Sequence, residues 1–250
     1  TNPAYSSMKL NARVSAARIL ERLDKNNTFI ASELKNEFDR HSNIDPRDRG
    51  LTTELVYGVL RQQRRLDYIL RPLIKGRYNR LDLDARILLR LGAYQIQFLD
   101  RIPKPICVSA TQDAARAMRK GRMTGLLNAV LRRVEPTIEL LPGDTSVKAI
   151  AIRASMPEWI VEALVEAYGK EDCESEAMAL RDRAPTTIRP NLKKGTRDKV
   201  REELSGEGFS CEDGPFGSLV VSGPGDPFSS ECFKRGGFVP QDPSSLAVVD

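Results

Sequence analysis

The sequence predicts a protein of two parts, an all-α helical bundle followed by a smaller α+β domain. In the first 135 residues, apolar side chains recur at helical spacing almost throughout. Short β-branched runs bounded by glycine and proline turns occur only after residue 185. The stretch 141–144, which contains adjacent proline and glycine, separates the two patterns. A chain of 250 residues is long enough for two ordinary domains or one large one.

The front part is expected to consist almost entirely of helices. Asp45 and Pro46 mark the start of one of them, because aspartate caps a helix and proline fits its first turn. Residues 83–99 are apolar on nearly every side, which predicts a central buried helix. The helix that Pro46 begins is expected to end near Arg61. The other helices are predicted at residues 10–23, 29–38, 66–74, 106–118 and 124–134.

The rear part is expected to combine helices with a small sheet. Asp242 is expected to cap a helix that starts at Pro243, and Trp159 to anchor its helix by packing. The remaining helices are predicted at residues 145–153, 158–168, 172–181 and 196–204. The strands are predicted at residues 186–189, 209–211, 218–222 and 236–239.

Composition excludes several classes of protein. The content of 40% hydrophobic and 29% charged residues is that of a globular protein. The sequence has no run of about 18 apolar residues and no basic leader followed by an apolar core, so we expect a cytoplasmic protein. No C-x-x-C pair accompanies the single histidine, His41, so no metal site is expected. Four scattered cysteines are expected to be reduced and structural, namely Cys107, Cys173, Cys211 and Cys232.

Charge is unevenly distributed along the chain. Residues 1–135 carry 26 Lys and Arg against 14 Asp and Glu, a net charge of +12, whereas residues 136–250 carry 13 against 20, a net charge of −7. This asymmetry favours a polyanionic partner for the front part. Arginine, which dominates there, suits bidentate phosphate contacts. A set of solvated helix faces rich in arginine would give the same counts, so charge alone leaves both interpretations open.

Three motifs in the front part resemble the NusB-like fold. They are DRGLTTELVYGVLR at residues 48–61, GAYQ followed by RIP within residues 92–103, and GLLNAVLRR at residues 125–133. Their order and spacing are similar to those of the third, fifth and closing helices of that fold. A NusB-like domain occurs alone, as a transcription antitermination factor, or fused to RNA methyltransferases. The rear part of the sequence decides between these alternatives.

Three motifs in the rear part resemble the RsmB/Sun family of ribosomal RNA (cytosine-5) methyltransferases. They are MPEWI at residues 156–160, RAPTTIRPN at residues 183–191 and GFVPQDPSS at residues 237–245. Pro190 departs from the family pattern by standing before the asparagine, without changing the order of the motifs. The resemblance implies three ranges: a NusB-like RNA-binding domain at 8–140, an α+β domain at 141–235, and the start of a Rossmann-like methyltransferase domain at 236–250.

The resemblance also implies an activity for a full-length parent, which would transfer a methyl group from S-adenosylmethionine to C5 of a cytosine in 16S ribosomal RNA. That chemistry needs a glycine-rich loop for the cofactor and two cysteines, one of which attacks the flipped base. Neither feature occurs in these 250 residues, so we expect the chain itself to bind no cofactor and transfer no methyl group. The alternatives from other classes are a non-catalytic NusB-like antitermination factor and a module that binds a ribosomal protein.

The residues expected to contact RNA are basic or amide side chains, with a solubilising surface as the alternative for each. Arg13 is the leading candidate, because we expect it to face away from the apolar stripe of its helix. The resemblance places Gln241 at the entry to the cofactor-binding domain, where its side chain would contact the cofactor. Ribosomal RNA is the expected partner of a monomeric chain that binds neither membrane nor metal. The RNA candidates on the first helix are Lys9, Arg13 and Arg18. A second basic cluster consists of Arg116, Arg119, Lys120 and Arg122 and is expected to be continued by Arg132 and Arg133. The candidates of the rear part are Arg183, Arg189 and Asn191.

Overall fold

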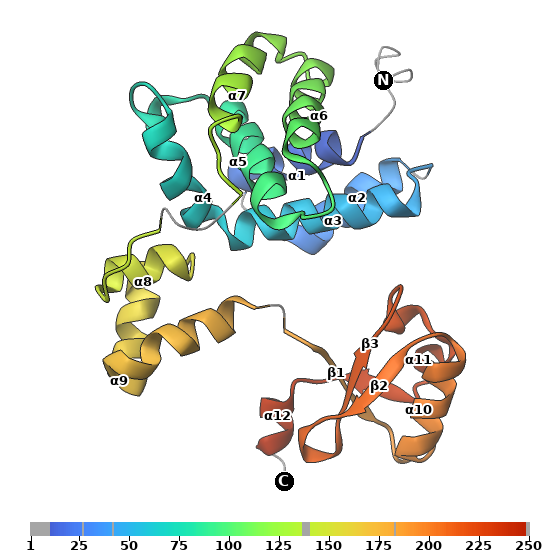
Figure 1. Cartoon of the computed structure of the whole chain (residues 1–250). Helices are drawn as coiled ribbons and strands as arrows, with labels where there is room; N and C mark the ends of the chain where they lie inside the picture. Colours follow the sequence, from blue (N-terminus) through green and yellow to red (C-terminus); the bar gives the residue numbers. More distant parts are fainter. Residues whose placement is uncertain (1–10, 27, 42, 137–140, 183, 249–250) are drawn as a thin grey trace. The chain divides into compact units, whose positions relative to one another are not determined.

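The computed structural model describes residues 11–26, 28–41, 43–136, 141–182 and 184–248. The chain divides between Arg181 and Asp182 into two compact units, which we call the helical unit and the sheet unit (Figure 1). The predicted fold class, a helical bundle followed by a small sheet domain, is confirmed. The border between the compact units lies later than residue 140, because the helices that follow this position pack with the front part of the chain.

The helical unit is built around α5 (Leu83–Phe98), the helix whose sequence is apolar on nearly every side. Leu88, Leu89 and Leu91 are buried on different sides of it. Because α5 contacts α1, α3, α4, α6 and α7, the predicted central helix is confirmed. The surrounding elements are α1 (Ala12–Asn26), α2 (Ile30–Arg40), α3 (Pro46–Arg61), α4 (Gln63–Leu70), α6 (Lys104–Ala117) and α7 (Thr124–Leu131), with the 3-10 turns η2 (Arg71–Leu73), η3 (Tyr78–Arg80) and η4 (Gly121–Met123).

Two glycines of the sequence motifs are required by close helix packing. Gly58 of α3 faces Tyr94 of α5, and a Cβ atom at Gly58 would overlap the tyrosine ring. Gly92 of α5 faces Leu131 of α7 in the same way. Larger residues at either position would push these helices apart, which explains why the motifs carry glycine inside helices despite its cost to helix stability.

The predicted start of α3 is confirmed. The side chain of Asp45 accepts a hydrogen bond from the backbone N–H of Arg47 at 2.8 Å, which satisfies one donor of the first turn.

Arg22 of α1 joins that helix to α2. It forms ion pairs with Glu33 at 2.5 Å and Glu37 at 2.8 Å, and both glutamates are buried. The hydrogen bond from Arg22 lowers the pKa of Glu33. Pairing with Arg22 therefore favours the charged form of the Glu33 carboxylate.

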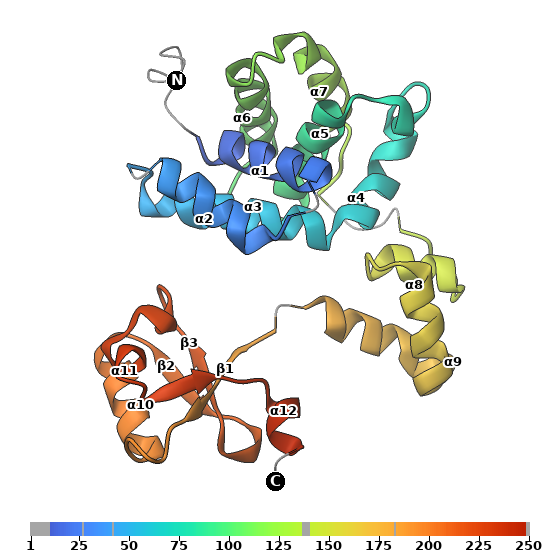
Figure 2. The same ribbon diagram turned by 180° about the vertical axis from the view of Figure 1, so that it is seen from behind.

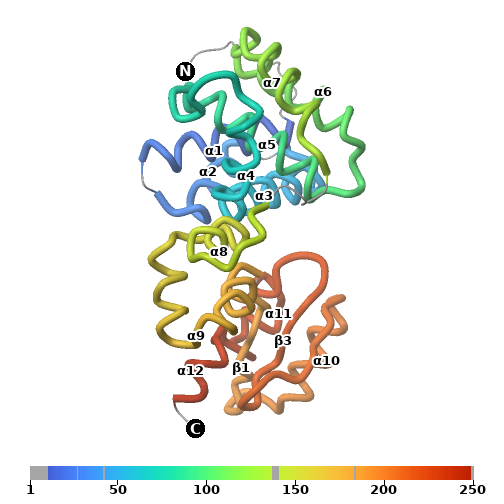
Figure 3. Tube along the Cα trace, turned by 60° about the vertical axis from the view of Figure 1, so that its left-hand side comes forward, coloured from blue at the N-terminus to red at the C-terminus, as the bar shows by residue number. Residues whose placement is uncertain are grey.

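Two more helices, α8 (Val147–Arg153) and α9 (Glu158–Arg181), belong to the helical unit. α9 is interrupted at Gly169, where φ is 81°, so the helices predicted at 158–168 and 172–181 form its two arms. A small core formed by residues such as Ile150, Val161 and Cys173 holds α8 and α9 together. α8 also lies beside α4 (Figure 3), which brings together segments that are distant in the sequence.

The sheet unit contains, among the described residues, one antiparallel sheet in the strand order β2–β3–β1–β4. Ile188, Leu219 and Phe238 are fully buried on the face covered by α10 and α11 (Figures 1 and 2). All four predicted strands are confirmed, whereas α11 was not predicted. The elements are β1 (Thr186–Pro190), α10 (Arg197–Gly206), β2 (Ser210–Asp213), β3 (Leu219–Ser222), α11 (Glu231–Lys234), β4 (Phe238–Pro240) and α12 (Pro243–Ala247), with the 3-10 turns η5 (Pro215–Gly217) and η6 (Pro227–Ser229).

The end of the described chain belongs to this same sheet. β4 pairs with β1, with Arg189 opposite Val239 and Pro190 opposite Phe238. Pro190 is accommodated because the pairing of β1 with β3 ends at Ile188, so Pro190 has a strand partner on one side only. Asp242 then caps α12 by accepting a hydrogen bond from the N–H of Ser244 at 2.8 Å, as predicted. Residues 236–248 thus pack with the sheet unit, not as a separate body.

Candidate nucleic-acid interface

Arg13, the leading candidate for RNA contact, turns toward the bundle interior. Its Nε atom donates a hydrogen bond at 2.5 Å to Oε1 of Gln95, a fully buried residue of α5. Burial lowers the pKa of Arg13. The expectation that this side chain faces away from the packed side of α1 is therefore wrong, because a buried amide offers it a hydrogen-bond acceptor. Arg18, further along α1, is half-buried, and Lys9 lies outside the described residues.

The basic residues between α6 and α7 lie close to acidic side chains. Lys120 forms an ion pair with Asp84, and Arg122 lies 3.6 Å from Asp82. Arg119 is exposed and has a left-handed backbone with φ of 59°. The Arg122–Asp82 pair is exposed, and exposed ion pairs are worth about 0–1 kcal/mol each, so phosphates can compete for cations such as Arg122. Their local charge is nevertheless partly neutralised, and Arg116 is likewise paired, with Asp113 at 2.7 Å.

Arg132 and Arg133 do not continue that cluster in space. They follow the C-terminal end of α7, whereas Lys120 and Arg122 precede its N-terminal end. An eight-residue helix separates its ends by about 12 Å, since each residue rises about 1.5 Å. Arg133 instead donates a hydrogen bond at 3.2 Å to the carbonyl oxygen of Leu73 in η2.

Leu73 lies in a basic segment, residues 71–80, that was not predicted from the sequence. Four exposed cations, Arg71, Lys75, Arg77 and Arg80, follow α4 in the connection to α5. None of them forms an ion pair with another residue of the described ranges. The signal was available, because residues 71–80 contain four cations and no acidic residue. We call these four residues together with Arg133 the basic surface.

In the sheet unit, Arg189 and Asn191 have different roles. Arg189 is exposed on β1, on the face opposite Ile188. The side chain of Asn191 donates a hydrogen bond at 2.9 Å to the carbonyl oxygen of Gly236 and accepts one from the N–H of Lys193 at 3.2 Å. Asn191 therefore holds the turn after β1, and its amide is already engaged. Arg183 lies outside the described residues.

A cavity of about 720 Å³ opens beside Arg189. Lys193 and the exposed ring of Phe216 line it, together with Val239. Phe216 has a left-handed backbone, with φ of 52°. This second basic region combines three cations with apolar surface, and one of them, Arg197, is paired with Asp213 at 2.7 Å.

A glycine-rich loop between a parallel strand and a helix, of the kind that cradles S-adenosylmethionine, is not found among the described residues. A glycine-rich loop that cradles a nucleotide cofactor follows a parallel strand and opens a helix, but every strand pairing described here is antiparallel. Gln241 donates its backbone N–H to the carbonyl oxygen of Thr187 at 3.2 Å, which continues the pairing of β4 with β1. This contact involves the backbone alone, so a cofactor contact by the Gln241 side chain stays a prediction.

Three of the four cysteines are buried in the described structure. Cys107, Cys173 and Cys232 are buried, and burial raises the pKa of each thiol, which disfavours the reactive thiolate. Within the described ranges, no group of His, Cys, Asp and Glu could hold a metal ion. Of the helices in those same ranges, none is both long and apolar enough to cross a membrane.

Comparisons with known proteins match the two parts of the chain separately. The model of the NusB family matches residues 10–136, and the model of the RsmF/B-like methyltransferase ferredoxin-like domain matches residues 156–225. The ribosomal RNA small subunit methyltransferase B of Pseudomonas putida is 34% identical over 81% of this chain and 45% of its own length. The probable ribosomal RNA small subunit methyltransferase B of Bacillus subtilis is 28% identical over 96% of this chain and 54% of its own length.

A solved structure shows the same fold. The crystal structure of PH0851 aligns with 97% of this chain and 56% of its own, with a TM-score of 0.67 and 17% sequence identity. The chain thus spans about half the length of the relatives it matches. The chain thus joins a NusB-type helical bundle to a ferredoxin-like domain of the RsmF/B-like methyltransferase type. The chain belongs to the NusB family, and the resemblance to the RsmB/Sun methyltransferases is confirmed.

Proposed function

We propose that this chain is the RNA-recognition part of an S-adenosylmethionine-dependent methyltransferase that forms 5-methylcytosine in 16S ribosomal RNA. The names of its relatives, ribosomal RNA small subunit methyltransferase B, support the RNA and the reaction class. The match to an RsmF/B-like ferredoxin-like domain supports a methyltransferase over a lone NusB-like antitermination factor.

The basic surface is the observation that carries the RNA-binding part of this proposal. Its cations are exposed, and the four of residues 71–80 have no acidic partner among the described residues. Phosphate contacts of this kind release counterions, so they position RNA and depend strongly on salt without reading the base sequence. α9, by contrast, exposes Glu162, Glu166 and Glu171, which would repel a phosphate backbone.

Charge reversal on the basic surface tests this assignment. The double variant Arg77→Glu and Arg80→Glu is expected to bind 16S ribosomal RNA more weakly and to lower the salt slope of binding by about two, one for each lost phosphate contact. Lys170→Glu on α9 is the matched control, because Lys170 is exposed but lies outside the basic surface. Equal losses in all the variants would remove the basic surface from the interface.

Methyl transfer is proposed to belong to a longer parent protein and not to this chain. Two observations support this proposal: the described strand pairings are all antiparallel, and burial raises the pKa of each described cysteine. Incubation of the 250-residue chain with labelled S-adenosylmethionine and 16S ribosomal RNA is expected to transfer no label. Incorporation of label at a cytosine by this chain alone would contradict the proposal that methyl transfer needs a longer protein.

A further inference from the structure

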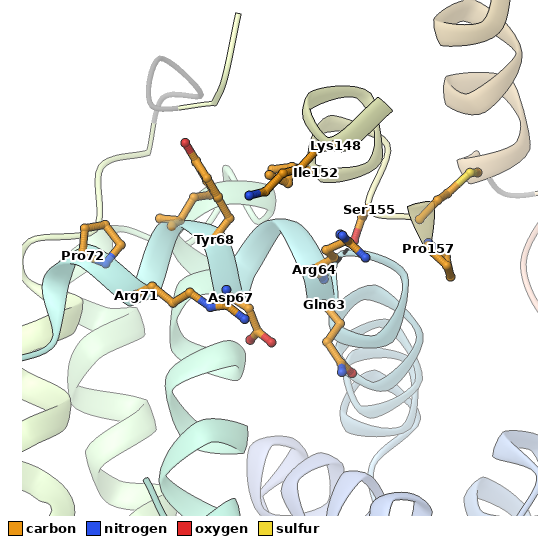
Figure 4. Close-up of a pocket in the computed structure, with 12 residues that line it drawn as sticks. Gln63, Arg64, Asp67, Tyr68, Arg71, Pro72, Lys148, Ile152, Ser155 and Pro157 are labelled. Atoms are coloured by element: carbon orange, nitrogen blue, oxygen red, sulfur yellow. Dashed lines mark hydrogen bonds between the residues drawn. The ribbon is translucent and has the colours of Figure 1, made fainter. Parts of the chain in front are cut away.

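A second cavity, of about 960 Å³, opens between α4 and α8 in the helical unit (Figure 4). Tyr68 and Arg71 lie on the α4 side, and Lys148 and Ile152 on the α8 side. Neither family model covers the whole cavity, because the NusB match ends at residue 136 and the ferredoxin-like match begins at residue 156. α8 falls between the two matches, so its lining residues Lys148 and Ile152 lie outside both of them.

The walls of the cavity are fixed to each other. The hydroxyl oxygen of Ser155 accepts hydrogen bonds from the backbone N–H groups of Arg64 at 3.1 Å and Arg65 at 3.4 Å. Arg64 also forms an ion pair with Glu158 at the start of α9. Ser155 has a left-handed backbone, with φ of 57°, a strained conformation that is enriched at functional sites. The cavity is therefore pre-formed, as ligand pockets usually are.

The charge left uncompensated around this cavity is positive. Asp67, its one lining aspartate, accepts two hydrogen bonds from Arg90, each at 2.7 Å, and one from the hydroxyl of Tyr78 at 2.6 Å. The guanidinium of Arg90 thus balances the charge of the Asp67 carboxylate. Arg71 and Lys148 are exposed and form no ion pair with any residue of the described ranges. An anionic ligand therefore suits the cavity better than a cationic one.

An aromatic ring stands beside these cations. Tyr68 is half-buried, and Figure 4 shows it reaching from α4 into the space that Lys148 approaches from α8. Ile152 and Met156 add apolar surface to the lining. Unpaired RNA bases are commonly bound by stacking on an aromatic side chain next to basic groups that hold the backbone.

We propose that this cavity receives one unpaired nucleotide of the bound RNA. Its base lies against Tyr68, and its phosphate lies near Lys148 and Arg71. The inference rests on the proposed RNA-binding function. It deepens that function because Arg71 belongs both to the cavity and to the basic surface. An RNA strand that follows the basic surface toward α4 reaches the cavity at Arg71. Up to this residue the protein contacts phosphates, and inside the cavity it binds an unpaired base.

The test compares two RNA probes with the whole 250-residue chain, a single-stranded decacytidine and a blunt duplex of ten base pairs. Tyr68→Ala is expected to weaken binding of the single strand about tenfold, the scale of one lost stacking contact, and to leave duplex binding unchanged. Tyr68→Phe keeps the ring and is expected to retain affinity. Tyr168→Ala on α9 is the matched control, since Tyr168 is exposed and lies outside the cavity.

Lys148→Glu tests the phosphate contact separately. It is expected to weaken single-strand binding and to lower the salt slope by about one, whereas Lys170→Glu leaves both unchanged. A direct reporter comes from Tyr68→Trp combined with Trp159→Phe, which leaves one tryptophan in the chain, inside the cavity. Its fluorescence is expected to be quenched by decacytidine with the same midpoint as binding.

Three results would overturn the inference: unchanged single-strand affinity in Tyr68→Ala, an equal loss in Tyr168→Ala, or no quenching of the reporter during binding. Each of these leaves the proposed RNA binding intact, because the wild-type chain still binds. A wild-type chain that binds neither probe nor 16S ribosomal RNA would overturn the proposed function together with the inference.

Discussion

Ser155 connects the α8–α9 segment to the start of α4, and its substitution makes the packing of the helical unit testable. The first N–H groups of a helix have no partner within the helix, and here the Ser155 hydroxyl supplies an acceptor for two of them, those of Arg64 and Arg65. Ser155→Ala removes that acceptor without adding volume. Two partly buried donors of α4 are then left without a protein acceptor.

The expected loss follows from these two contacts. Loss of a capping hydroxyl costs about 1 kcal/mol, and a buried unsatisfied donor costs about 1–3 kcal/mol. Because these donors are only partly buried, we expect Ser155→Ala to lower the free energy of unfolding in urea by about 1–2 kcal/mol. Ser155→Gly is expected to lose less, since glycine relieves about 1 kcal/mol of strain at a φ of 57°.

Hydrogen exchange locates the effect. The amides of Arg64 and Arg65 are expected to exchange faster in Ser155→Ala, while amides of α5 keep their protection. Ser175→Ala is the matched control, because the hydroxyl of Ser175 is exposed and bonds only within its own turn, to the carbonyl oxygen of Asp172. Wild-type stability together with unchanged exchange at Arg64 and Arg65 would refute the capping role.

Two further predictions concern the bundle core. Gly58→Ala is expected to lower the free energy of unfolding by about 1–3 kcal/mol, because the added methyl group overlaps Tyr94. Gly50→Ala on the same helix has open space around it and is expected to be neutral or stabilising. Urea unfolding measures both effects. The lowered pKa of Glu33 means that its pair with Arg22 stabilises the fold above the ordinary glutamate pKa and stops doing so as pH falls through the lowered value. Glu33→Gln should therefore lose stability at pH 7 and depend less on pH below 5, and an unchanged acid-unfolding profile would contradict this.

Local patterns in the sequence were sufficient to predict most of the elements. Apolar periodicity placed α1 to α9, and the capping pairs Asp45–Pro46 and Asp242–Pro243 marked two helix starts that the structure confirms. Alternating runs between turns placed the strands. α11 was missed because four residues are too few to show a helical period. These features depend on neighbouring residues, so one sequence contains enough information for them.

Features that depend on distant contacts could not be predicted in this way. Arg13 was expected to face outward because helical spacing shows the apolar side of α1 but not the buried Gln95 that binds the guanidinium. Trp159 was expected to anchor its helix but is 68% exposed. The cavity between α4 and α8 joins segments about 80 residues apart, and no local pattern marks it.

The most direct test of RNA recognition is the affinity of the 250-residue chain for 16S ribosomal RNA as a function of salt. If the basic surface contacts the phosphate backbone, the affinity falls steeply between about 50 and 200 mM salt, with a slope of roughly −0.7 to −0.9 for each phosphate contact. The five cations of that surface predict a total slope of about −3 to −5. An affinity independent of salt, or no binding at the lowest salt concentration, would contradict the assignment.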